Sequence, residues 1–415
     1  MTVSRLLEDE TQRGAVLGKV LIVDEAGMIS GRHMDELLKL AERENARVLF
    51  SGDTRQIQSV EASDALRILE RESQMKSISL TGVQRQTQAE YRDAIQTLRD
   101  SPEQGFEKLE KLGAVREVPY LDTARTVAAA YRELAADPIR KVLVVAGTHE
   151  EIGRITHAIR GDMKQDGELE RGMVFERHAP LQWTEAQKKD LSNYQEGQIL
   201  QFHRSSHGIS KHETLVVERA NASHIVARDR HGVERMVSPT QARSFSVHER
   251  QQIEVAPGDR LLLTGNRREE DFRATNGELT KVRGVDGGRI QLEDGRTLPA
   301  NYREFDHGYA ITAHRSQGKT VDAVVLSGDT MKQDQFYVAA SRGRDGITII
   351  TSDVDRLRES LGISTARPSA TELAREQAQT HPALEHGLAH QPVQNIEPPA
   401  PQHEISHGHD LGMSL

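Results

Sequence analysis

The sequence contains no cysteine, few aromatic residues and no long apolar run. The absence of cysteine excludes disulfides, thiol catalysis and zinc sites with cysteine ligands. No apolar run approaches the roughly 18 residues that a membrane helix needs, and the first ten residues lack the apolar segment of a signal peptide. Aromatic residues are 4% of the 415, so a stacking platform for single-stranded nucleic acid would have few members. We therefore expect a cytoplasmic protein, and its net charge of −9 is unlike that of a histone-like DNA binder.

A change in composition near residue 363 separates the end of the chain from the rest. Residues 363–415 contain six of the 13 prolines and six of the 18 histidines but no lysine. Such a segment buries too little apolar surface to offset the entropy cost of ordering it, so we expect a disordered acidic, histidine- and proline-rich tail. The spacing of His403, His407 and His409 would suit a metal, although histidines in a polar tail are more often solvated.

Short β-branched runs alternate with helical patterns in the first part of the chain. The runs Lys19–Asp24, Arg47–Ser51 and Lys141–Ala146 are continuously apolar, as is typical of strands buried on both faces of a parallel sheet. Helical patterns lie between them, at His33–Asn45 and Ala62–Glu72. This repetition predicts an α/β, doubly wound architecture.

The pattern changes between about residues 171 and 304, where turn residues separate short alternating segments. Asp286–Gly288 and Asp294–Gly295 are hairpin signals, because glycine tolerates positive φ. This pattern predicts a β-rich, barrel-like region. Continuous apolar runs return at Val321–Leu326 and Gly346–Thr351, so we expect the β-rich region to be an insertion in an α/β domain.

Two expected strands are followed by polar side chains that suit phosphate chemistry. Asp24 and Glu25 follow the first strand, and in a phosphate-cleaving enzyme Asp24 would hold Mg²⁺ through water while Glu25 polarises the attacking water. Gln56 follows the next strand and could sense a γ-phosphate. Ligands bind at the carboxyl ends of parallel strands. The alternative for both segments is a solvated turn.

Two arginines follow further apolar segments. In the segment Leu80–Gln86, Arg85 lies beyond an expected third short strand, and Arg342 ends the apolar run that begins at Phe336. A guanidinium that reaches a γ-phosphate neutralises charge in the transition state. Either arginine taken alone would more often be a surface residue.

The segment Ala313–Thr320 satisfies a loose form of the phosphate-loop pattern, with alanine at the position of the first glycine. A phosphate loop runs from a strand into a helix, whose N-terminal amides then cradle the phosphate. Here Lys319 and Thr320 lead directly into an expected strand, and the loop interior lacks glycine. We therefore interpret the match as accidental.

In order and spacing, these motifs resemble the series of the first DNA-helicase superfamily and its RecD-type branch. The series reads DEAG at 24–27, GDTRQ at 52–56, VQRQ at 83–86, AITAHRSQG at 310–318 and VAASRGR at 338–344. The resemblance covers roughly residues 1–355. It implies two RecA-like P-loop NTPase lobes, ATP and Mg²⁺ as cofactors, and 5′→3′ movement along single-stranded DNA.

The resemblance also implies roles for particular residues. Asp24 would bind Mg²⁺ and Glu25 would activate water, with Gln56, Arg85, Gln317 and Arg342 around the γ-phosphate. Thr312, His314 and Ser316 lie where the family contacts single-stranded DNA. Arg267 and Arg268, in the insertion, are candidates for contacts with the phosphate backbone.

The insertion carries a narrower resemblance. Residues 257–282 resemble the small Src-homology-type (SH3-like) barrel of the RecD-type branch, and residues 194–218 resemble a segment of conjugative relaxase–helicases of the TraI/TrwC kind (MobF class). Other conjugative transfer proteins are then expected partners. The expected divisions are a partial first lobe (1–90), the start of the second lobe (91–170), a β-rich insertion (171–250), the barrel (251–304), the end of the second lobe (305–362) and the tail (363–415).

One departure from the family concerns activity. The family's phosphate loop lies well before DEAG, whereas the 19 residues before Val20 contain no glycine-rich loop. The chain would then be truncated before DEAG, with an incomplete first lobe. We expect it not to hydrolyse ATP at a helicase-like rate by itself, because the cradle and lysine that bind the phosphates contribute much to catalysis.

Two other functions stay open. The chain could be a non-catalytic module that binds single-stranded DNA or a partner through the insertion and second lobe. It could also be a permuted phosphate-loop GTPase or kinase that uses Lys319, but the guanine-reading Asn-Lys-x-Asp sequence does not occur.

Overall fold

The computed structural model describes residues 1–53, 65–80, 82, 84–269 and 271–363. The chain divides into two compact units, Met1–Ala366 and Arg367–Leu415, of which only the first contains described residues. The expectations for Gln56 and for the tail therefore lie outside the described residues.

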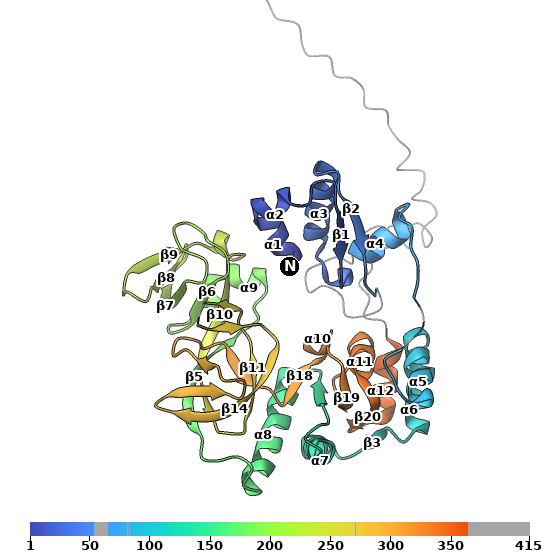
Figure 1. Ribbon diagram of the computed structural model, residues 1–415. Helices are drawn as coiled ribbons and strands as arrows, with labels where there is room; N and C mark the ends of the chain where they lie inside the picture. The colour runs from blue at the N-terminus through green and yellow to red at the C-terminus, as the bar shows by residue number, and fades with distance from the viewer. Residues whose placement is uncertain (54–64, 81, 83, 270, 364–415) are drawn as a thin grey trace, which may run out of the picture. The chain divides into compact units, whose positions relative to one another are not determined.

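The N-terminal part is built on a parallel pair of strands, β1 (Val20–Val23) and β2 (Arg47–Phe50). Its helices, in blue in Figure 1, are α1 (Val3–Glu8), α2 (Glu10–Gly14), the 3₁₀ turn η1 (Ala26–Met28), α3 (Gly31–Arg43) and α4 (Ala65–Glu72). Alternate strand residues pack against the core formed with these helices. On the other face Val20, Ile22 and Leu49 are 59%, 73% and 54% exposed. The expectation of burial on both faces was therefore wrong for this sheet.

A five-stranded parallel sheet forms the second α/β part, in the order β18-β4-β19-β20-β3. Its strands are β3 (Val115–Glu117), β4 (Val142–Ala146), β18 (Ala310–Thr312), β19 (Val321–Ser327) and β20 (Gly343–Thr351). Every residue of β4 is buried, and alternate β4 residues belong to two different core clusters. A parallel sheet with a core on each face is the predicted doubly wound architecture.

Helices supply both of these cores (Figure 1). One core involves α5 (Ala89–Asp100), α6 (Pro102–Lys111), α11 (Gln333–Ala340) and α12 (Val354–Gly362). The other involves α7 (Thr123–Ala135), which follows the 3₁₀ turn η2 (Tyr120–Asp122), and α8 (His149–Gln165). The short helix α10 (Ala313–Ser316) follows β18. None of the helices within the described ranges is long and apolar enough to span a membrane.

The β-rich region contains a six-stranded antiparallel sheet in the order β5-β10-β6-β7-β8-β9. Its strands are β5 (Met173–Pro180), β6 (Ile199–Phe202), β7 (Thr214–Ala220), β8 (Ile225–Arg228), β9 (Glu234–Val237) and β10 (Phe245–Val255). Between them lie α9 (Glu185–Lys189), η3 (Leu191–Asn193) and η4 (Pro239–Gln241). The boundary expected at 250/251 falls inside β10, which pairs with β5 along His248–Val255.

A second antiparallel sheet follows, in the order β16-β15-β14-β11-β17. Its strands are β11 (Arg260–Leu263), β14 (Glu278–Asp286), β15 (Arg289–Leu292), β16 (Thr297–Leu298) and β17 (Phe305–His307), and a separate hairpin joins β12 (Arg267–Arg268) to β13 (Arg273–Ala274). The β14–β15 and β15–β16 turns coincide with the two predicted hairpin signals. Closure of these strands into a barrel stays a prediction.

Candidate functional site

The adjacent carboxylates Asp24 and Glu25 lie at the carboxyl end of β1, and both are exposed. Glu25 adopts a left-handed backbone conformation with φ of 52°, which is uncommon for a residue with a side chain. The Glu25 amide donates to Asp24 Oδ1 at 3.0 Å. The next amide, of Ala26, donates to the carbonyl of Ser51 at 2.9 Å, which fixes the turn against the end of β2. Strain of this kind clusters at functional sites.

Gln317, which follows α10, lies against this pair. Its Nε2 donates to Glu25 Oε2 at 3.2 Å, across 292 positions of the sequence. Gln317 Oε1 is buried and has no hydrogen-bond partner among the described residues. The structure therefore brings together two of the residues predicted from separate motifs.

Arg342 follows α11 and is only 2% exposed. Its Nε donates to the carbonyl of Val338 at 2.8 Å, and one terminal nitrogen donates to Ser341 Oγ at 3.0 Å. Burial, and to a smaller extent the nearby Arg85 guanidinium, lower the pKa of Arg342 to about 10, while Glu25 opposes the shift. Among the described residues no ion pair with a carboxylate is recorded for Arg342.

Arg85 lies beside Arg342, but no strand positions it. The described residues between 77 and 87 contain no strand, and Leu80 is 90% exposed, so the expectation of a short strand just before Arg85 was wrong for these residues. Instead Arg85 donates to the carbonyl of Ser341 at 2.6 Å. Gln86 and Thr87 also hydrogen-bond to the backbone of residues 341–344, so this segment packs at the end of α11.

The three residues predicted to contact DNA lie at or just after the carboxyl end of β18, next to the end of β4. Thr312 caps α10, and its hydroxyl accepts the Arg315 amide at 3.4 Å. His314 is half-buried, and burial lowers its pKa. Ser316 is fully buried and its hydroxyl donates to the carbonyl of Ala313 at 2.6 Å, so it offers no surface to a ligand in this conformation.

Sequence reasoning missed Arg315, whose side chain is partly buried in the same segment. Burial lowers its pKa, and Asp306 opposes the shift. Its neighbour His149, at the start of α8, also has a pKa lowered first by burial and then by Arg315. Only the pairing of β18 with β4 brings these two basic residues together, so nothing in the local sequence indicates the cluster.

The Lys319 segment connects a helix to a strand, in the opposite order to a phosphate loop. It runs from the end of α10 into β19, as the sequence predicted. Lys319 Nζ donates to the carbonyl of Gly277 at 3.1 Å. Burial lowers the pKa of Lys319.

Arg267 and Arg268 form strand β12. Arg267 donates to Asn301 Oδ1 at 2.7 Å and lies over the ring of Tyr302, with 5.5 Å between the guanidinium carbon and the ring centroid. Arg268 is exposed. The hairpin therefore presents the anchored Arg267 together with Arg268, for which no hydrogen bond or ion pair occurs within the part of the chain that the structure describes.

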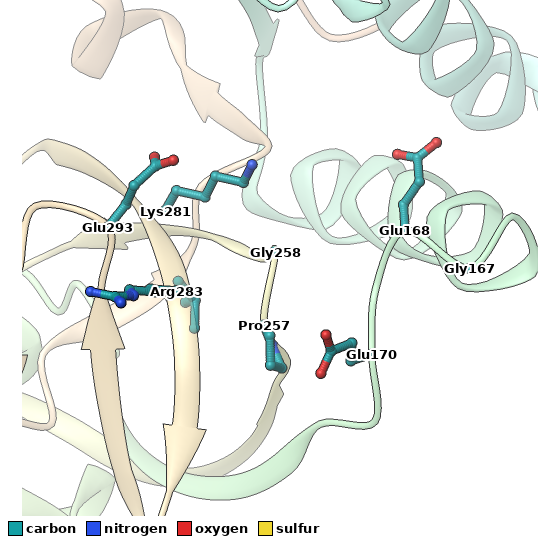
Figure 2. A pocket seen from close by; sticks show the side chains of 9 residues that line it. Gly167, Glu168, Glu170, Pro257, Gly258, Lys281, Arg283 and Glu293 are labelled. Atoms are coloured by element: carbon teal, nitrogen blue, oxygen red, sulfur yellow. The ribbon is translucent and has the colours of Figure 1, made fainter.

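A hollow of about 350 Å³ lies elsewhere, between the end of α8 and the β14–β15 hairpin (Figure 2). None of the predicted site residues lines it. Its walls are mostly charged and exposed, and comprise Gly167, Glu168, Glu170, Pro257, Gly258, Lys281, Val282, Arg283 and Glu293. Across the described ranges no group of three or more His, Asp or Glu side chains could hold a metal ion.

Comparisons with known proteins match this motif series. A family model described as an AAA domain matches residues 1–120. The conjugal transfer protein TraA of Rhizobium radiobacter is 24% identical over 352 residues, which are 83% of this chain and 25% of TraA. The multifunctional conjugation protein TraI of Escherichia coli is 22% identical over 400 residues, 80% of this chain and 22% of TraI. The matches confirm the predicted resemblance to the helicase region of a conjugative relaxase, and the chain spans about a quarter of the length of these relatives.

Solved structures similar to this chain include two Pif1 helicases. The Bacteroides protein in complex with ADP-AlF3 and ssDNA is 16% identical, with 90% of this chain and 78% of that chain covered and a TM-score of 0.39. The Candida albicans protein is 15% identical, with 91% and 82% covered and a TM-score of 0.40.

Proposed function

We propose that this chain is the helicase part of a conjugative relaxase, a family whose full-length members bind ATP with Mg²⁺ and move 5′→3′ along single-stranded DNA. The observation that carries the proposal is the pair of neighbouring guanidiniums, Arg85 and Arg342. Two cations held close together, one of them buried, repel each other unless an anion neutralises both. A transferring phosphoryl group is an anion that a pair of arginines suits.

The carboxylates supply the complementary part of the proposed nucleotide site. Asp24 is exposed and uses one oxygen for the Glu25 amide, which leaves the other for a water molecule of hydrated Mg²⁺. The metal would neutralise phosphate charge. Glu25 would orient the attacking water, and its contact with Gln317 would report whether the nucleotide is present. Gln56 stays a prediction for the same site.

Single-stranded DNA would bind at the carboxyl edge of the second sheet. Thr312 and His314 lie there, together with the basic Arg315. Arg267 and Arg268 would contact the phosphate backbone, which fixes position but reads no sequence. Other conjugative transfer proteins as partners, and the cytoplasm as the location, are part of the same proposal.

A non-catalytic DNA-binding module is the second candidate. It is favoured by the basic side chains of Arg315, Arg267 and Arg268, which could contact a phosphate backbone without a bound nucleotide. In this case the second sheet and the insertion would bind single-stranded DNA without ATP turnover.

ATP turnover by the chain, with and without single-stranded DNA, separates the two functions. A helicase part that assembles a working nucleotide site shows DNA-stimulated turnover, which Glu25→Gln abolishes and Arg342→Lys strongly reduces, because lysine lacks the planar fork. The exposed Arg289→Lys serves as the matched control. DNA binding without turnover supports the module. A chain that neither turns over ATP nor binds DNA at low salt overturns both.

A further inference from the structure

Lys319 connects the loop that carries Gln317 to the β-rich insertion. The loop leaves α10 and turns at Gly318, which has φ of 74°, so that Lys319 extends towards the turn between β13 and β14. There its Nζ donates to the carbonyl of Gly277 at 3.1 Å. Among the described residues, this carbonyl is the hydrogen-bond acceptor of the Lys319 side chain. A partly buried ammonium that donates to a single carbonyl retains two further donors.

The turn that Lys319 contacts is hydrogen-bonded to the residues that precede the β12–β13 hairpin. Gly277 N donates to the carbonyl of Leu263 at 2.8 Å, and Asn276 N donates to Asn266 Oδ1 at 2.9 Å. Asn266 directly precedes β12, in which Arg267 pairs with Ala274. A displacement of the hairpin therefore moves the Gly277 carbonyl as well.

We infer that Lys319 is a positioning residue that couples binding of a nucleic-acid phosphate backbone at the β12–β13 hairpin to the conformation of the Gln317 loop. The inference rests on the proposed function, because it takes the hairpin as a DNA contact. Hydrogen bonds between two elements couple them only if binding at one element changes the conformational equilibrium of the other. Here the two elements are the β12–β13 hairpin and the Gln317 loop. Lys319 is a side chain that joins the two elements, through its hydrogen bond to the Gly277 carbonyl.

Hydrogen exchange of the full chain tests this coupling, with a fluorescein-labelled oligothymidylate as the probe. Affinity is measured by anisotropy, and exchange is followed with and without the oligonucleotide at residues 317–321, which form the Gln317 loop and exclude the proposed DNA contacts His314 and Arg315. The variants are Lys319→Met, which removes the donor, and Lys319→Arg, which keeps one. Lys141→Met is the charge-matched control, because Lys141 is exposed at the opposite, amino end of β4.

In the wild type we expect the oligonucleotide to slow exchange in residues 317–321. Lys319→Met should bind it with an affinity within about threefold of the wild type, since one uncontacted charge contributes little, but lose the slowing. Lys319→Arg and Lys141→Met should retain it. The coupling is refuted if Lys319→Met binds DNA and the DNA slows exchange of its loop as much as in the wild type. This holds even if the loop of the variant exchanges faster than that of the wild type without DNA. If the wild type does not bind the oligonucleotide, the proposed function fails and the inference with it.

Discussion

Asp259 links the β-rich region to the second α/β part, and its substitution should weaken the protein strongly. This aspartate is fully buried between β10 and β11. Its two oxygens accept Arg160 Nε at 2.8 Å and a terminal nitrogen of Arg160 at 2.9 Å. They also accept the Tyr309 hydroxyl at 2.8 Å and the Ala256 amide at 2.7 Å. Every polar atom of the carboxylate is thus paired.

The change Asp259→Asn removes the charge and one acceptor but keeps the shape. The Arg160 side chain is only 12% exposed, so its guanidinium would be left largely buried without its main counter-ion. Removing one partner of a buried ion pair costs about 3–5 kcal/mol. We expect a loss of about 3 kcal/mol in the free energy of unfolding, which corresponds to a fall of roughly 1 M in the urea midpoint.

Trp183 makes this change measurable, because it is the only tryptophan in the chain and packs edge-on against Tyr194 with 5.1 Å between ring centroids. Its fluorescence in urea reports unfolding of the β-rich region. Glu218→Gln, which breaks the exposed ion pair with Arg228, is the control and should leave the midpoint unchanged. A loss below about 1 kcal/mol for Asp259→Asn, the size expected of an exposed pair, would refute the reasoning.

Three further predictions concern pH, packing and DNA contacts. Burial lowers the pKa of His248 from its ordinary value of 6.5 to about 4, so the folded state favours the neutral imidazole. The protein should therefore lose stability as the pH falls from about 6.5 to about 4. In His248→Gln the urea midpoint should depend less on pH over this range. Gly105→Ala should destabilise by more than about 1 kcal/mol because its Cβ would lie 2.2 Å from Leu98 Cα, whereas Gly161→Ala, in open space on α8, should stabilise by up to about 1 kcal/mol in thermal unfolding. Arg268→Ala should weaken oligothymidylate binding and reduce its salt slope by about one, while the buried Ser316→Ala should leave both unchanged; equal effects would contradict the proposed DNA contacts.

Local sequence patterns were sufficient to predict the strands of the first parallel sheet and central strands of the second. The apolar runs became β1, β2 and β4, and the segment after Lys319 became β19. These strands were predictable because a short, continuous run of β-branched apolar residues favours a buried strand over a helix or a loop. The glycine turns of the insertion likewise marked the ends of β14 and β15.

The errors came from features that depend on distant partners. Whether β1 is covered on both faces depends on how many strands and helices surround it, so the exposure of Ile22 is invisible in the run itself. The position of Arg85 depends on backbone acceptors at residues 341–343, more than 250 positions away in the sequence. Strand propensity in the segment before Arg85 carries no information about those acceptors.

By itself, then, the sequence determined the parallel strands, the chemistry of the residues that follow them, and the order of motifs, because these depend on neighbours within a few positions. Only the tertiary structure decided which of these residues meet. It placed Gln317 against Glu25 and Arg85 beside Arg342, and it buried Ser316. The physical reason is that hydrogen bonds and burial depend on distance in space and not on separation in the sequence. The pairing of β18 with β4 and the packing of residues 85–87 against residue 341 set these distances.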